Sequence, residues 1–178
     1  LYPGQNTTGL CPLQRFSGAP VYLAGQEPTA NEVAARGERY WRPYHDALAA
    51  ELARVRARHG RAVLWEGHSI RSTVPFLFDG RLPDFNLGTA AGASCAPERQ
   101  ARIEAVMAAQ DNYTWVANGR FKGGYITRHY GRPGESVDAV QLELAQCTYM
   151  DEATGRYQPE RAANVQALVG ALLEAAVA

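Results

Sequence analysis

The stretch of residues 62–72 constrains the fold most, because an apolar run of strand length leads there directly into chemically capable side chains. The apolar residues predict a buried strand, and Glu66, His68 and Arg71 follow them at once. Open α/β sheets keep their sites where strands emerge at their carboxyl ends. The pattern therefore predicts either a site with His68 as metal ligand or proton carrier, or a structural histidine that caps the strand.

The segment before this strand has a helical pattern. Residues 29–59 carry apolar side chains at steps of three and four, which predicts a helix with Asn31 as N-cap and a break near Pro43. Gly60 stands where a helix C-terminal glycine is expected, and the strand follows immediately. A helix that returns directly into an apolar strand is half of an α/β unit.

The rest of the chain predicts further elements of both kinds. Residues 69–96 are interpreted as a long loop that lines a site, since Pro and Gly interrupt them while their apolar content argues against disorder. A helix is predicted from Pro97 to about residue 110 and another over 159–178. Strands are predicted over 113–116, 124–130 and 137–144. We therefore expect one α/β domain over residues 1–178.

Composition excludes several classes of partner. Lys plus Arg and Asp plus Glu are 18 each, so the net charge of zero does not favour nucleic acid or a membrane surface as partner. No apolar stretch approaches the roughly 20 residues that span a bilayer. The three cysteines are far apart and form no C-x-x-C pair, which predicts a cytoplasmic protein rather than a disulfide framework. The loop-rich start at Leu1 is interpreted as the continuation of a longer chain.

Two segments contain groups suited to chemistry. Glu143 lies between two leucines of a predicted strand, so its carboxylate is expected either to pair with an arginine or to act in acid–base chemistry with a raised pKa. Residues 119–130 place cations and hydroxyls between glycines, which indicates an anion site or a solvated basic hairpin. His68 and His129 lack nearby second ligands, so a metal pair is weakly indicated. Two further histidines, His45 and His59, are predicted to lie on the surface.

Five blocks taken together resemble the N-formylglutamate amidohydrolase family. They occur in the family's order and cover nearly the whole chain: LYPGQNTTGLCP at 1–12, GHSIRS at 67–72, LPDFNLGT at 82–89, NGRFKGGYITRHY at 118–130 and QLEL at 141–144. The resemblance implies a fold related to zinc carboxypeptidases and aspartoacylase, which is a three-layer α/β architecture with a mixed sheet flanked by helices. It also implies one zinc ion and hydrolysis of N-formyl-L-glutamate to formate and L-glutamate, the last step of one bacterial route of histidine degradation.

The resemblance assigns roles to individual residues. By it, His68 is a zinc ligand, and Glu143 is the general base that later acts as general acid. A substrate with two carboxylates should meet cationic side chains, because guanidinium and ammonium groups bind carboxylates well. The candidates are Arg128, on a predicted strand, then Arg71, then Arg120 and Lys122, with Asn86, Tyr125 and Thr127 as hydrogen-bonding groups for the formyl or α-carboxylate end.

The resemblance also implies that part of the site lies upstream of Leu1. A histidine and a carboxylate that complete the zinc site, and an Asn-Arg pair for the substrate, precede the first matching block in the family. Because a catalytic zinc normally takes three protein ligands, residues 1–178 alone are expected to bind zinc poorly and to be inactive. Two alternatives stay open: a non-catalytic remnant that binds an acidic metabolite or a protein partner, and a zinc amidohydrolase for a different N-acyl amino acid.

Overall fold

The computed structural model describes residues 9–178, which divide into two compact units. One unit contains residues 9–51 together with Thr73–Arg81, and the other contains Leu52–Ser72 with Leu82–Ala178. Among the helices of residues 9–178, none is long and apolar enough to cross a membrane.

The first unit holds the start of the long helical segment. Helix α1 (Ala30–Arg36) is capped by Thr29, whose Oγ1 accepts the Glu32 N–H at 3.2 Å, so the N-cap lies two residues before the predicted Asn31. The π-helical segment Gly37–Trp41 then leads into helix α2 (Arg42–His59). The chain is helical without interruption from Ala30 to His59, so the predicted break near Pro43 is wrong, and only the type of helix changes just before this residue, which has no N–H to donate.

His45 is buried, and its prediction as a surface histidine is wrong. The residue is 8% exposed, and its ring lies 4.1 Å from that of Trp41 and 5.2 Å from that of Tyr44. Positions four apart on a helix face the same side, so Trp41 covers the imidazole. His59, at the end of α2, is exposed as predicted.

The second unit is built on a mixed four-stranded sheet of order β1-β4-β2-β3. The strands are β1 (Ala62–Ile70), β2 (Phe85–Gly88), β3 (Trp115–Ala117) and β4 (Val137–Ala145). Strand β4 runs parallel to β1 and antiparallel to β2, which in turn pairs parallel with β3. A hairpin of β5 (Met150–Asp151) and β6 (Arg156–Tyr157) stands apart from this sheet.

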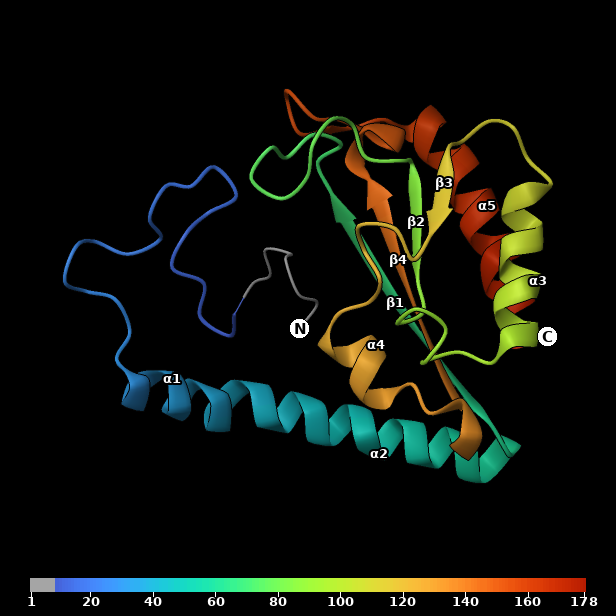
Figure 1. Ribbon diagram of the computed structural model, residues 1–178, viewed down its shortest axis with the longest axis horizontal. Helices are drawn as coiled ribbons and strands as arrows, with labels where there is room; N and C mark the ends of the chain where they lie inside the picture. The colour runs from blue at the N-terminus through green and yellow to red at the C-terminus, as the bar shows by residue number, and fades with distance from the viewer. Residues whose placement is uncertain (1–8) are drawn as a thin grey trace. The chain divides into compact units, whose positions relative to one another are not determined.

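Helices cover the two faces of this sheet, as Figure 1 shows. Helix α3 (Pro97–Ala108) and helix α5 (Pro159–Val177) pack together on one face, and the short helix α4 (Tyr125–Tyr130) lies on the other. The α/β prediction with a mixed sheet flanked by helices is thus confirmed.

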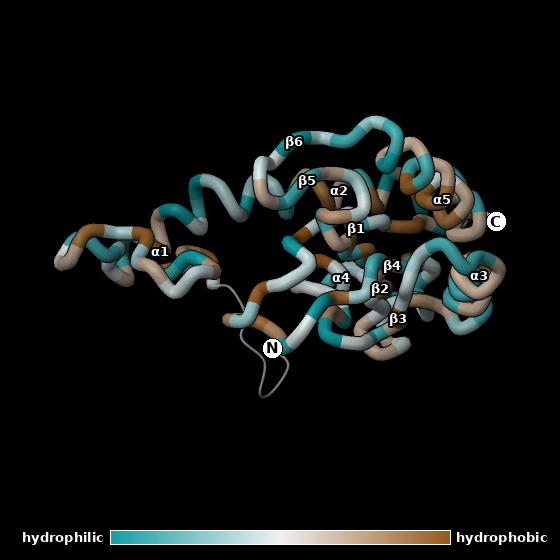
Figure 2. The backbone as a smooth tube through the Cα atoms, turned by 90° about the horizontal axis from the view of Figure 1, so that it is seen from above, coloured by the Kyte–Doolittle hydropathy of each residue, from teal (hydrophilic) through white to brown (hydrophobic). Residues whose placement is uncertain are grey.

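The hydrophobic core lies between the sheet and the pair α3 and α5. Side chains of a strand alternate between faces, and Val140 and Leu142 of β4 join Phe85 and Leu87 of β2 in this core. The helices contribute Ile103, Met107, Val165, Leu172 and Ala176. Figure 2 shows hydrophobic segments in the strands and in α5 where these elements pack together. The intervening residues of β4, including Gln141 and Glu143, therefore face α4, because successive side chains of a strand point to opposite faces.

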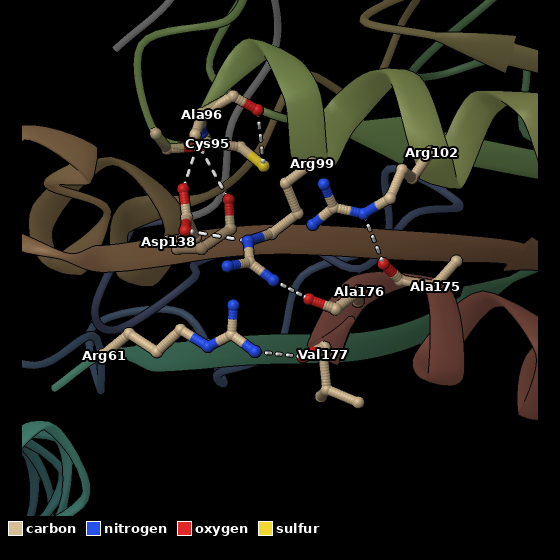
Figure 3. Close-up of polar contacts among 11 residues, drawn as sticks. Arg61, Cys95, Ala96, Arg99, Arg102, Asp138, Ala175, Ala176 and Val177 are labelled. Atoms are coloured by element: carbon tan, nitrogen blue, oxygen red, sulfur yellow. Dashed lines mark hydrogen bonds and ion pairs between the residues drawn. The ribbon is translucent and has the colours of Figure 1, made fainter. Parts of the chain in front are cut away.

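A buried ion pair fastens the end of α5 to the sheet (Figure 3). Arg99 Nε lies 2.8 Å from Asp138 Oδ2, and both side chains are less than a tenth exposed. Arg99 Nη1 also donates to the carbonyl of Ala176, and Asp138 Oδ1 accepts the Ala96 N–H at 2.6 Å. Because the last carbonyls of a helix have no partners within it, this guanidinium satisfies a group that burial would otherwise leave unpaired.

Two element predictions are wrong. Residues 124–130 were expected to form a strand because they follow turn-forming residues and are rich in β-branched and aromatic side chains, but residues 125–130 form α4, in which Tyr125 and His129 stack at 4.9 Å one turn apart. The predicted loop over 69–96 contains β2 (Phe85–Gly88), which pairs on both sides. At β2, tertiary pairing overrides the local pattern.

Candidate active site

A row of polar side chains crosses three strands on the face of the sheet that α4 covers. In the strand register His68 of β1 is opposite Glu143 of β4, and Glu143 is opposite Asn86 of β2. Residues opposite each other on paired strands project from the same face, so these three side chains stand side by side. The next row holds Glu66 opposite Gln141. The structure thus brings together His68, Glu143 and Asn86, although Glu143 lies more than 50 residues after the other two in the sequence.

His68 is held by a neighbouring carboxylate on its own strand. Its Nε2 lies 2.9 Å from Glu66 Oε1, and the His68 side chain is 46% exposed whereas that of Glu66 is 13% exposed. The hydrogen bond to Glu66 raises the pKa of His68, burial opposes the rise, and the charges of Glu66 and Glu143 add to it. Burial opposes ionisation of Glu66, but the hydrogen bonds from His68 and Thr127 outweigh it and leave the pKa of Glu66 lowered.

Glu143 is a buried carboxyl with a pKa near neutral pH. The residue is 7% exposed. Burial raises its pKa from 4.5 to about 7, with the positive charge of His68 opposing the rise and the charge of Glu66 adding to it. A group with a pKa near the working pH can both accept and return a proton, which is the property that acid–base catalysis needs.

Asn86 fixes the backbone beside Glu143. The residue is 1% exposed, and its Nδ2 donates to the carbonyl oxygens of Pro83 at 2.8 Å and Glu143 at 3.1 Å. Its Oδ1 is buried without a hydrogen-bond partner among residues 9–178. The amide nitrogen is therefore committed to holding β2 and β4 together, and Asn86 as a substrate contact stays a prediction.

Close backbone packing positions α4 over the polar row. A Cβ atom on Gly88 would lie 2.6 Å from the nitrogen of Gly123, so only glycine allows this approach. Gly123 itself has φ of +112°, and a Cβ there would lie 2.7 Å from Thr127 Cγ2. The Gly124 N–H donates to Gln141 Oε1 at 2.7 Å, which ties the start of α4 to β4.

Three of the candidate cationic residues lie on α4 or in the segment that leads into it. Arg128 lies on α4 rather than on the predicted strand, and its Nη1 donates to the Gly123 carbonyl at 2.8 Å. Arg120 is half-buried, which lowers its pKa, and its guanidinium lies 5.2 Å from the centre of the Phe121 ring. The Lys122 carbonyl accepts the Ala90 N–H at 2.6 Å.

Of the three remaining candidates, Thr127 is fully buried, whereas Arg71 and Tyr125 are exposed. Arg71 follows β1 and donates from Nη2 to the carbonyl of Glu152, beyond β5. Tyr125 is 43% exposed and stacks on His129. Neither contact brings the side chain onto the row of His68 and Glu143, and both residues stay predictions as substrate contacts.

Sequence reasoning did not select Glu66 as a site residue. The available signal was its spacing, because residues two apart on a strand project from the same face. Within residues 9–178 no group of three or more His, Cys, Asp or Glu side chains could hold a metal ion. An imidazole with one nitrogen held by a carboxylate is nevertheless the chemistry expected of a single metal ligand, so this part of the chain fits a metal site as one contributor.

Comparisons with known proteins agree with one another. The family model described as N-formylglutamate amidohydrolase matches residues 1–150. An N-formylglutamate deformylase of Pseudomonas aeruginosa is 57% identical over 173 residues, which is 97% of this chain and 65% of that protein. An N-formylglutamate deformylase of Pseudomonas putida is 50% identical over 179 residues, which is 100% of this chain and 67% of that protein.

A solved structure extends the likeness to the fold. The crystal structure of an N-formylglutamate amidohydrolase from Ralstonia eutropha JMP134 superposes with a TM-score of 0.74 at 28% identity. The match covers 89% of this chain and 57% of that one. This chain therefore spans about two thirds of the curated relatives and a smaller part of the solved structure.

Proposed function

The chain belongs to the N-formylglutamate amidohydrolase family, and from this premise we propose that it carries the proton-transferring part of a zinc-dependent N-formylglutamate deformylase. The observation that carries the proposal is the cross-strand pair of His68 and Glu143, in which the carboxyl has a pKa of about 7. The names of the two Pseudomonas relatives supply the substrate.

His68 and Glu143 have distinct tasks in the proposed hydrolysis. When bound, zinc would polarise the formyl carbonyl and lower the pKa of the attacking water. Glu143 takes the proton of that water as the water oxygen bonds to the formyl carbon, and it gives a proton to the amide nitrogen as the carbon–nitrogen bond breaks. The products are formate and L-glutamate, and the carboxyl returns to its starting state.

His68 is the residue of this chain proposed to hold the zinc ion. Because a catalytic zinc takes about three protein ligands, the proposal includes further ligands upstream of Leu1, as the family resemblance implies. We also propose that the complete fold is a three-layer architecture like that of zinc carboxypeptidases.

The cationic residues are proposed to bind the two carboxylates of the substrate. Arg128 comes first because it lies on α4, the helix that covers the polar row, and Arg71, Arg120 and Lys122 follow. Tyr125 and Asn86 are proposed to supply hydrogen bonds, whereas the hydroxyl of Thr127, first predicted for the same task, is buried and donates to Glu66. A dianionic substrate favours guanidinium groups, which bind carboxylates through two parallel hydrogen bonds.

The proposed reaction has a place in metabolism. Release of formate and L-glutamate is proposed to be the last step of one bacterial route of histidine degradation. A cytoplasmic location is proposed with it, because the three cysteines are far apart in the sequence and form no C-x-x-C pair.

The test combines zinc content with product formation in the protein purified at its natural length. We expect about one zinc per chain and formate release from N-formyl-L-glutamate, with much slower turnover of N-acetyl- and N-succinyl-L-glutamate. His68→Ala should remove the zinc and the activity, whereas His59→Ala, which changes an exposed histidine at the end of α2, should keep both. Zinc-free protein that releases formate at the native rate, or preference for another acyl group, would overturn the proposal.

A further inference from the structure

Glu66 is a carboxylate that neither the resemblance nor the proposed reaction uses. It lies two residues before His68 on β1, so both side chains project from the face that carries Glu143. Its side chain is 13% exposed. A carboxylate buried to this extent is unfavourable unless hydrogen-bond donors replace the water that it loses.

The donors come from two different elements. Glu66 Oε1 lies 2.9 Å from His68 Nε2, and Oε2 accepts the hydroxyl of Thr127 at 2.7 Å. Thr127 is 0% exposed and belongs to α4, and it packs so closely against Gly123 that a Cβ atom on that glycine would lie 2.7 Å from Thr127 Cγ2. One carboxylate oxygen thus faces the imidazole, and the other is anchored in the protein interior.

This geometry determines which nitrogen of His68 carries a proton. An ionised carboxylate only accepts hydrogen bonds, so Nε2 must be the protonated nitrogen of the neutral ring. The lone pair of the neutral imidazole then lies on Nδ1. A carboxylate that accepts from one ring nitrogen fixes the tautomer and the ring orientation of a metal-binding histidine.

We propose that Glu66 is a positioning residue that holds His68 through Nε2 and so directs Nδ1 to the metal, with Thr127 anchoring Glu66. The inference rests on the proposed zinc chemistry for the role of Nδ1, but the hydrogen-bonded arrangement exists without the metal. Glu66 touches neither the substrate nor the metal in this arrangement and acts through His68.

The first test is nuclear magnetic resonance of the histidine rings in zinc-free protein labelled with ¹⁵N, at a pH where the ring of His68 is neutral. The signal is assigned with His68→Gln, since the chain has four histidines. We expect a proton on Nε2 that exchanges slowly with water, and we expect Glu66→Ala to abolish this slow exchange. A proton on Nδ1, or slow exchange that persists in Glu66→Ala, would overturn the inference.

Conservative variants distinguish the hydrogen-bonding role of Glu66 from the effect of its negative charge. Glu66→Gln keeps an oxygen that accepts from Nε2 and an amide that reaches Thr127, so it should preserve the slow exchange. Thr127→Ser keeps the hydroxyl and should behave like the native protein, whereas Thr127→Val should speed the exchange. Equal exchange in Thr127→Ser and Thr127→Val would remove Thr127 from the proposal.

The second test measures zinc affinity by competition with a chelator. We expect Glu66→Ala to weaken zinc binding about 10- to 100-fold and Glu66→Gln to weaken it less. Glu135→Ala is the matched control, because Glu135 is an exposed carboxylate at the opposite end of the sheet. Native affinity in Glu66→Ala contradicts the inference, as does a loss in Glu66→Gln as large as that in Glu66→Ala, which would make Glu66 a direct ligand.

The two tests separate failure of this inference from failure of the proposed function. If the protein binds no zinc, the proposed function fails while the ring measurement still decides whether Glu66 orients His68. If zinc binds through Nε2, the proposed function stands and the inference fails.

Discussion

Replacing Glu143 by glutamine should stabilise the protein in a way that depends on pH. A carboxyl that ionises at about 7 when folded and at 4.5 when unfolded binds its proton more tightly in the folded state. The native protein therefore loses stability as the pH rises from 4.5 to 7, and glutamine, which does not ionise, removes that loss. Each pH unit between the two pKa values corresponds to about 1.4 kcal/mol, so the loss between pH 5 and pH 8 is on the order of 2.5 kcal/mol.

The assay is urea unfolding of both proteins at pH 5, 6, 7 and 8 in the presence of a chelator, so that metal binding adds nothing to stability. We expect the free energy of unfolding of Glu143→Gln minus that of the native protein to grow by about 2.5 kcal/mol over this range and to level off above pH 7. Glu135→Gln, at an exposed position, should give a flat difference. A flat difference for Glu143→Gln, or one that grows towards low pH, would refute the assignment of a raised pKa caused by burial.

Three further predictions concern the framework of the site. Asp138→Asn leaves the buried guanidinium of Arg99 without its counter-charge and should cost about 3–5 kcal/mol, read as a lower urea midpoint. An unchanged midpoint would show that the pair contributes nothing. Gly123→Ala forces a side chain into the left-handed region and against Thr127, so thermal unfolding followed by circular dichroism should show a loss of about 1–3 kcal/mol. Leu142→Ala opens a cavity in the core and should cost about 2–5 kcal/mol in urea unfolding, whereas exposed Leu173→Ala should cost far less, and similar losses would contradict the assigned core.

The strands that carry the candidate site follow from periodicity in the sequence. The apolar run before Glu66 predicts β1, and the alternation over 137–144 predicts both β4 and the face on which Glu143 lies. The terminal helix α5 and helix α3 also follow from apolar spacing and from the prolines at their starts. In these elements the apolar periodicity of the sequence favours the same structure that their packing in the fold favours.

The elements that complete the site have no such local pattern. Strand β2 has only four residues and ends at Gly88, and it exists because β4 and β3 pair with it on both sides. Helix α4 has a strand-like composition, and the contacts that hold it, the close approach of Gly123 to Gly88 and the hydrogen bond of Thr127 to Glu66, join residues far apart in the sequence.

The role of Glu66 also depends on a contact between residues far apart in the sequence, so the sequence alone could not show it. Its partner Thr127 lies 61 residues further along the chain, and only the folded structure brings the two together. Spacing along β1 could have placed Glu66 beside His68, but it could not show that the far carboxylate oxygen is anchored in the interior.

Steady-state kinetics of Glu143→Gln with N-formyl-L-glutamate test the central claim most directly. In the protein purified at its natural length and loaded with zinc, we expect kcat for formate release to fall by about 10²- to 10⁴-fold while KM and zinc content change little, because the change removes proton transfer rather than binding. Formate release at the native rate by Glu143→Gln would contradict the assignment of Glu143 as the proton-transferring group of an N-formylglutamate deformylase.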